Sequence, residues 1–247
     1  MLAVVAAIAA LAVQTPNPCQ DPAQGLRCPD LVMAPPSHLR VERTPGGRQV
    51  LRMQNRIVNT GAIAAEFFAQ RTGPREMHAR QVIVDAAGVR RRVETGAELY
   101  YTSVPSRGGD YWKFMDAARF EVWSLAPDGR PIALARVGPK LNYCLRDLER
   151  VRTWTRSPRR RVFGACNQSA RKTEVTLGTS VGWADIYPPS YPGNLIDVTG
   201  LVGCFVVLHH VDPGQHVLES NEANNTSHKT VRLPYRPGAQ GCPPYLG

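Results

Sequence analysis

Short runs of alternating apolar and polar residues, separated by turn residues, make up most of this chain. The segments Gln49–Ile57 and Val58–Phe67 alternate loosely and are interrupted at Thr60-Gly61, which predicts a strand with a break. Val202–Val211 is a continuous apolar run that is short enough for a buried strand. The pattern therefore favours several short strands over long helices.

Two further pairs of segments have the pattern of β-hairpins. Gln81–Asp85 and Val89–Val93 enclose a short glycine turn. Tyr111–Trp123 and Ile132–Val137 flank a Pro-Asp-Gly turn sequence at 127–129. Helical periodicity is weak throughout, and Leu141–Val151 is the best candidate for one short helix.

Composition agrees with an all-β fold, because the 247 residues include 21 Gly and 21 Pro, and 43% of them are hydrophobic. We predict a single sandwich-like β domain of a catalytic type, with long loops and little helix. The domain is expected at 47–235, after a Pro-rich extended lead-in at 15–46 that lies along it around Asp30–Met33. A C-terminal tail at 236–247 is expected to be tied back by Cys242.

The first residues predict export. Leu2–Val13 is an unbroken apolar run of 12 residues, which is shorter than the ~20 residues that a membrane-spanning helix needs. With small residues at Ala10–Ala12, the segment 1–14 reads as a secretory signal peptide, and a buried N-terminal helix is the alternative. We expect a secreted, extracellular protein with no membrane association after cleavage.

Six cysteines fit an exported protein, since their number is even and no two of them form a C-x-x-C pair. Six cysteines allow 15 pairings, and six free thiols are the alternative. Proximity along the chain favours the pairs Cys19–Cys28, Cys144–Cys166 and Cys204–Cys242.

Positive charge is concentrated in one segment of a chain whose formal net charge is +10. Seven arginines lie between Arg146 and Arg161. The candidates for binding a polyanion among them are Arg150, Arg152, Arg156, Arg159, Arg160 and Arg161. They predict either contact with an anionic wall polymer or a solvated loop, and export argues against nucleic acid as the partner.

Three segments resemble the lysyl oxidase family in its bacterial, secreted branch. Gly138–Asp147 reads GPKLNYCLRD and is similar to the family's G-x-K-x-x-[FY]-C-L-x-D segment. Gly178–Asp197 contains VGWADIY, and Asp197–Asn225 ends in ESNEANN, both similar to later family motifs in the same order. The resemblance implies a copper enzyme that oxidises primary amines, such as peptidyl lysine of an extracellular protein, through lysyl tyrosylquinone.

The resemblance assigns that cofactor to two residues, Lys140 and Tyr187. Formation of the quinone requires an amine nucleophile, and an arginine cannot supply it because its guanidinium stays protonated. Lys140 is one of only four lysines in this arginine-rich chain, so its presence at this position is informative. A surface lysine and a core tyrosine are the ordinary alternative.

The copper site is where the chain departs from the family. The family's three alternating histidines, which face one metal from one side of a strand, correspond to Gly109, Tyr111 and Lys113. The position nearest to the proposed catalytic base is Arg119. We therefore expect the copper-binding triad to be missing, and with it both copper and the quinone.

Three functions follow from these observations. The first is a lysyl-oxidase-like protein whose activity is lost or altered. The second is a non-catalytic extracellular binding or adhesion module, which the likeness of Gly200–Asn225 to immunoglobulin-like adhesion modules favours. The third is an active copper amine oxidase with a relocated site formed by His209 or His210 together with His216.

Overall fold

The computed structural model describes residues 16–104, 109–153, 156–238 and 241–247. The predicted signal peptide at 1–14 lies outside these residues. Within them, no helix has the length and apolar character needed to cross a membrane.

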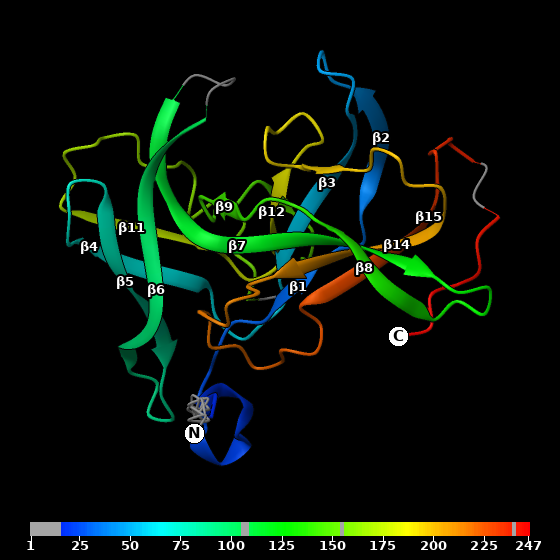
Figure 1. The fold of residues 1–247 in the computed structure, drawn as a ribbon. Coiled ribbons are helices and arrows are strands. Elements are labelled where there is room, and N and C mark those ends of the chain that lie inside the picture. Colours follow the sequence, from blue (N-terminus) through cyan, green and yellow to red (C-terminus); the bar gives the residue numbers. More distant parts are fainter. Residues whose placement is uncertain (1–15, 105–108, 154–155, 239–240) are drawn as a thin grey trace, which may run out of the picture.

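The fold is all-β, as predicted, and consists of two curled antiparallel sheets packed in a sandwich-like arrangement (Figure 1). The smaller sheet has the order β1-β3-β12-β10, and β2 and β13 also pair with β3. Its strands are β1 (Leu31–Met33), β2 (Ser37–Arg43), β3 (Gln49–Asn59), β10 (Glu149–Arg150), β12 (Trp183–Tyr187) and β13 (Leu195–Asp197). Helix among the described residues is limited to two short 3-10 turns, η1 (Pro18–Gln20) and η2 (Pro22–Gln24).

The larger sheet has nine strands in the order β11-β4-β5-β6-β7-β14-β15, and β8 and β9 also pair with β7. These strands are β4 (Ala65–Arg71), β5 (Glu76–Val84), β6 (Arg90–Val104), β7 (Gly109–Leu125), β8 (Pro131–Val137), β9 (Leu141–Tyr143), β11 (Glu174–Thr179), β14 (Gly203–Val211) and β15 (Thr226–Leu233). The hairpins β5–β6 and β7–β8, the break between β3 and β4, and the buried strand β14 are therefore confirmed.

The longest strand, β7, bends in its middle. Its first half pairs with β6 and its second half with β14, so that one strand joins both halves of the sheet (Figure 1). Asp116 lies at the bend with a φ of 51°, a conformation that L-residues rarely adopt. The Asn142 side-chain oxygen accepts a hydrogen bond from the Asp116 backbone N–H at 2.9 Å, which fixes the bend against β9.

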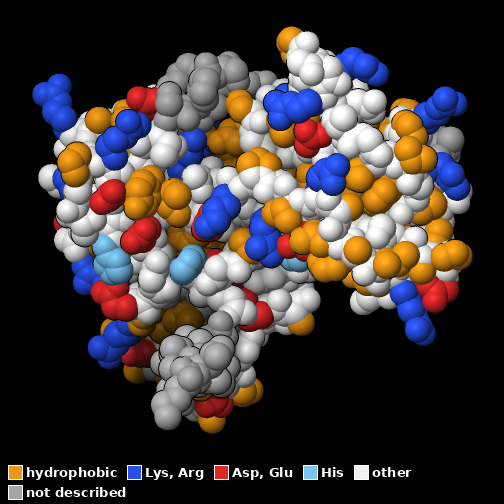
Figure 2. Space-filling view, viewed as in Figure 1, with side chains coloured by type: hydrophobic (Ala, Val, Ile, Leu, Met, Phe, Trp, Pro, Cys, Tyr) orange, Lys and Arg blue, Asp and Glu red, His pale blue; other side chains and the backbone are white. Residues whose placement is uncertain are grey.

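The core lies between the sheets and is filled by side chains from both. Phe67 of β4 packs on Phe114 of β7 with ring centroids 4.7 Å apart. Outside the core, β8 exposes Ile132, Leu134 and Val137. Figure 2 shows hydrophobic side chains gathered on the side where Figure 1 places β8 and the C-terminal tail, and Lys and Arg side chains spread over this face.

Two expectations about local structure need correction. The helix expected at Leu141–Val151 is wrong, because this segment forms β9, an irregular stretch and β10. Leu141, Tyr143 and Leu145 are all buried at a spacing of two residues, which suits an extended chain rather than a helix. The lead-in at 15–46 is extended where it forms β1 and β2, but both strands belong to the smaller sheet, so the β structure begins before the expected residue 47.

The structure contains the three disulfides expected from proximity, Cys19–Cys28, Cys144–Cys166 and Cys204–Cys242. The last of these ties the C-terminal tail to β14, as predicted. In the tail, the Leu246 N–H also donates to the carbonyl of Gly129 at 2.9 Å.

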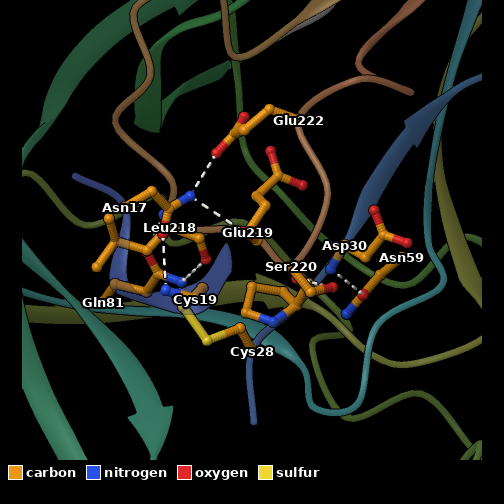
Figure 3. The surroundings of a disulfide bond; sticks show 11 residues. Asn17, Cys19, Cys28, Asp30, Asn59, Gln81, Leu218, Glu219, Ser220 and Glu222 are labelled. Atoms are coloured by element: carbon orange, nitrogen blue, oxygen red, sulfur yellow. Dashed lines mark hydrogen bonds between the residues drawn. A yellow bond between two sulfur atoms is a disulfide. The ribbon is translucent and has the colours of Figure 1, made fainter. Parts of the chain in front are cut away.

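Next to the Cys19–Cys28 disulfide lie the carboxylates of the buried Glu219 and the partly buried Glu222, and Figure 3 shows the hydrogen bond from Asn17 to Glu222. We call Glu219, Glu222, Asn17 and Asn225 the carboxylate–amide cluster. Glu219 accepts from the Leu31 backbone N–H and from the Asn225 amide. Glu222 accepts from the amides of Asn17 and Asn225 at 2.8 Å each. The cluster thereby joins the N-terminal segment to the loop between β14 and β15.

Candidate functional site

A cavity of about 360 Å³ lies where β7, β12 and the loops after β9 and β12 meet. We call it the tyrosine pocket. It is lined by Tyr111, Arg146, Ala165, Cys166, Gln168, Ile186, Tyr187, Pro188 and Tyr191. Its volume is in the usual range for small-molecule sites.

Strand geometry and one asparagine hold the aromatic wall in place. Tyr187, at the end of β12, stacks on the buried Tyr143 of β9 with centroids 3.7 Å apart and an interplanar angle of 12°. Asn194 accepts from the Tyr143 hydroxyl at 2.9 Å and donates to the Tyr187 carbonyl at 2.7 Å. Two rings and the following loop are therefore fixed by a single amide.

The loop after β12 places a third ring at the wall. Tyr191 lies edge-on to Tyr187, with centroids 4.7 Å apart and an interplanar angle of 72°. Its hydroxyl is 3.3 Å from the hydroxyl of Tyr111. Burial raises the phenol pKa values of Tyr111, Tyr187 and Tyr191, so that all three stay protonated at neutral pH and can donate hydrogen bonds.

The opposite wall comes from the segment around Cys166. The Cys144–Cys166 disulfide ties this segment to the end of β9. The Trp112 backbone and indole N–H groups donate to the carbonyls of Asn167 and Ser169 at 3.0 and 3.1 Å. The segment is thus held to both β7 and β9, and the pocket has a rigid rim.

Among the residues that the structure describes, Arg146 supplies the only charged side chain that lines the pocket. It is half-buried, and its Nε is fully buried without a hydrogen-bond partner in the described residues. No acidic side chain of those residues lies within ion-pair distance of its guanidinium. A half-buried arginine left in this state can still bind an anion.

Behind the aromatic wall lie two fully buried polar side chains, Asp185 and Asn55. The register pairs Tyr187 with Asn55 and Asp185 with Ile57, which places these four side chains on the same face of the smaller sheet. Within the described part of the chain, neither carboxylate oxygen of Asp185 nor either polar side-chain atom of Asn55 has a hydrogen-bond partner. Burial raises the pKa of Asp185 well above its usual value, although the positive charge of nearby Arg146 opposes the shift.

The structure does not bring the predicted quinone residues together. Lys140 lies outside the pocket wall, with its side chain 77% exposed and its Nζ 2.6 Å from Asp116. Asn142, two residues further on, also contacts Asp116, whereas Tyr143 faces the other way and stacks on Tyr187. Because neighbouring side chains of an extended chain point to opposite faces, Lys140 and Tyr187 lie on opposite sides of β9.

The positions that correspond to the family's copper ligands lie on the first half of β7, and they do not fit a copper ion. Gly109 has no side chain to bind a metal, and of the three positions only Tyr111 lines the pocket. The Lys113 amine lies 4.7 Å from the centre of the Tyr111 ring, and burial lowers its pKa. An amine packed on the one potential ligand leaves no set of donors that converges on a metal.

The histidines of the proposed relocated copper site are separated. His209 is fully buried and stacks on Phe120 with centroids 4.2 Å apart. His210 points to the opposite face of β14 and lies 2.9 Å from the Thr226 hydroxyl. His216 packs beside Gly214, past the end of β14. The described residues contain no group of three His, Cys, Asp or Glu side chains that could hold a metal.

Two other sets of predicted residues have local partners. Arg119, at the position of the family's base, forms an ion pair with Glu121 at 2.7 Å. In the arginine-rich segment, Arg150 donates to the Ser157 carbonyl and Arg161 to the Leu148 carbonyl. Arg159 and Arg160 are exposed. This segment therefore both braces its own loop and presents charge to solvent.

Reading the sequence identified Tyr187 and Tyr111 but missed most of the pocket. Asp185 and Arg146 fall inside the quoted family motifs, where they gave no signal of their own. Tyr191 lies in the Pro-rich sequence YPPSYPGN, and its partner Tyr111 is 80 residues away along the chain. Only the folded chain shows that these side chains surround one cavity.

Comparisons with known proteins do not identify a family for this chain. No protein-family model matches the chain, and no curated protein matches it either. The likeness to lysyl oxidases therefore rests on the three motifs alone. The geometry of the site is the remaining evidence on function.

Proposed function

We propose that this chain is an exported binding protein, lysyl-oxidase-like in sequence, that has no copper–quinone chemistry and uses the tyrosine pocket to hold a small ligand. The observation that carries the proposal is the placement of Lys140 and Tyr187 on opposite sides of β9, with the Lys140 amine paired to Asp116. The amine has a structural partner at the bend of β7, and the phenol has one in the pocket wall.

The state of the former metal positions supports the same proposal. Gly109, Tyr111 and Lys113 provide one phenol, and the neighbouring amine stacks on it. Without imidazoles, copper cannot be held beside Tyr187, and the oxidation of its phenol has no catalyst. What remains is a preformed cavity with aromatic walls and a few convergent polar groups, which is typical of binding sites.

Export is supported by the three disulfides, since structural disulfides persist in oxidising compartments. The apolar segment 1–14 supplies the corresponding signal. On this proposal the protein acts outside the cell after the segment has been removed.

The experiment is to produce the protein in an oxidising compartment with added copper, and to measure bound copper and the intact mass after disulfide reduction. We expect far less than one copper per chain and no mass change from a Lys140–Tyr187 cross-link. Tyr187→Phe and Lys140→Met serve as matched controls and should show the same absence of a visible quinone band as the parent protein.

Stoichiometric copper with a hydrazine-reactive chromophore would overturn the proposal, provided that Tyr187→Phe abolishes the chromophore. In that case the chain would be an amine oxidase with a relocated metal site.

A further inference from the structure

We propose that the tyrosine pocket binds a carboxylate carried on a six-membered ring, with Arg146 pairing with the carboxylate and the tyrosine rings packing against the ring of the ligand. This inference rests on the proposed function as a binding protein, and it names the class of ligand.

The charge of the pocket selects an anion. Of the nine described residues that line the cavity, Arg146 alone is charged, and none is acidic. Its guanidinium has no ion-pair partner among the described residues, so it keeps its full capacity for a bidentate contact with a carboxylate. A cationic amine would meet this guanidinium with no carboxylate in the wall to offset the repulsion.

Asp185 does not neutralise Arg146. It lies behind the wall, does not line the cavity, and is outside ion-pair distance of the guanidinium. Burial also raises its pKa, which favours the neutral carboxyl over the carboxylate.

The shape of the wall selects a ring. Tyr187 and Tyr191 meet edge to face at 72° and form an aromatic corner, and Ile186 and Pro188 continue the apolar surface. A ring that stacks on one tyrosine meets the edge of the other, which is a favourable arrangement for aromatic groups. The volume of about 360 Å³ holds one substituted ring rather than a peptide or a folded partner.

Hydroxyl groups at the mouth add directional contacts. The hydroxyls of Tyr111 and Tyr191 are 3.3 Å apart, so one of them donates to the other and the second proton stays available to a ligand oxygen. Two ligands share the required chemistry, namely an aromatic acid and a uronic acid at the end of an acidic polysaccharide.

The experiment measures binding of two acids and their uncharged analogues to the mature, disulfide-bonded protein by calorimetry and ligand-observed NMR. The probes are benzoate with benzamide, and glucuronate with glucose. We expect at least one acid to bind about tenfold or more tightly than its analogue, and the preferred pair tells the two sources apart. Absence of binding by both acids at millimolar concentration, or equal affinity of acid and analogue, overturns the inference.

Three variants localise the contact. Arg146→Gln is expected to weaken acid binding about tenfold or more without affecting the analogue. Arg146→Lys keeps the charge but not the bidentate geometry, and should give an intermediate affinity, so the test does not depend on one variant. Arg159→Gln removes an exposed arginine of the same segment and should leave the affinity unchanged. An equal loss in Arg159→Gln would show that general charge attraction is responsible.

Copper content separates this test from that of the proposed function. A protein without copper that fails to bind either acid contradicts only the class of ligand. A protein with stoichiometric copper and a quinone contradicts the proposed function itself.

Discussion

Two regions of this molecule bury carboxylates in opposite ways. In the carboxylate–amide cluster, all four oxygens of Glu219 and Glu222 accept hydrogen bonds from amides or from the backbone. Behind the tyrosine pocket, Asp185 is as fully buried as Glu219, and its two oxygens have no hydrogen-bond partner in the described residues. Buried carboxylates are normally hydrogen-bonded, so Asp185 departs from the usual pattern.

Asp147 shows that the difference does not come from the sheet itself. It directly follows the pocket residue Arg146 in the sequence and is fully buried, yet it accepts hydrogen bonds from the Ser180 backbone and hydroxyl and from the Val162 backbone. The same part of the fold can therefore satisfy a carboxylate. We therefore expect the cluster to contribute to stability and the unpartnered Asp185 to lower it, as polar groups at functional sites often do.

The largest expected effect separates the two kinds of carboxylate. Glu219→Ala leaves the Leu31 N–H and the Asn225 amide without their acceptor, and should cost roughly 3 kcal/mol of unfolding free energy. Asp185→Asn removes an unpartnered buried acid and should be neutral or stabilising. Chemical denaturation measures both variants. Equal losses would mean that Asp185 has stabilising contacts comparable to those of Glu219.

The next test compares the two disulfides that adjoin these regions. Removal of Cys19–Cys28 or of Cys144–Cys166 by paired serine substitutions should cost roughly 3 kcal/mol in each case, because each bond closes a loop in the unfolded chain. Only the loss of Cys144–Cys166 should also weaken ligand binding, since Cys166 lines the pocket. Unchanged affinity in that variant would show that the rim does not need the bond.

Asp212 lies at the end of β14 beside the carboxylate–amide cluster. Its burial predicts that the stability of the protein depends on pH. It accepts from the His216 and Val217 backbone N–H groups, but burial raises its pKa from 3.8 to about 7. Because the folded pKa is the higher one, the contribution to stability is complete below about pH 4 and is lost as the pH rises through 7. Melting temperatures from pH 4 to 7 should fall for the parent protein and fall less for Asp212→Asn. A parallel decline in both would assign the effect to other groups.

The smallest effect is expected at Lys140. Its ion pair with Asp116 is largely exposed and therefore screened, so Lys140→Met should change the unfolding free energy by less than about 1 kcal/mol. Ligand affinity should not change, because Lys140 lies outside the pocket. A clear loss of affinity would place its amine nearer to the ligand than the structure does.

Much of the fold was predictable because its signals are local. Turn sequences marked the hairpins, alternation marked the strands, and proximity marked the disulfides. The helix expected at Leu141–Val151 was wrong because burial of Tyr143 against Tyr187 requires an extended chain, and this contact spans 44 residues.

The site was less predictable because it depends on contacts between residues that are far apart in the sequence. Tyr187 stood out through a motif, but its position relative to Lys140 depends on which face of β9 each side chain takes. Arg146 was visible only as one of seven arginines, and its isolation from acidic partners is a property of the folded chain.

The bend of β7 at Asp116 has a consequence for how the molecule moves. A continuous strand passes from one half of the large sheet to the other, so the sheet has no seam along which one half could swing open by itself. Any large opening would have to break the backbone ladder on both sides of β7 at once. A small molecule therefore enters and leaves the cavity without any opening of the large sheet, whose strands stay paired.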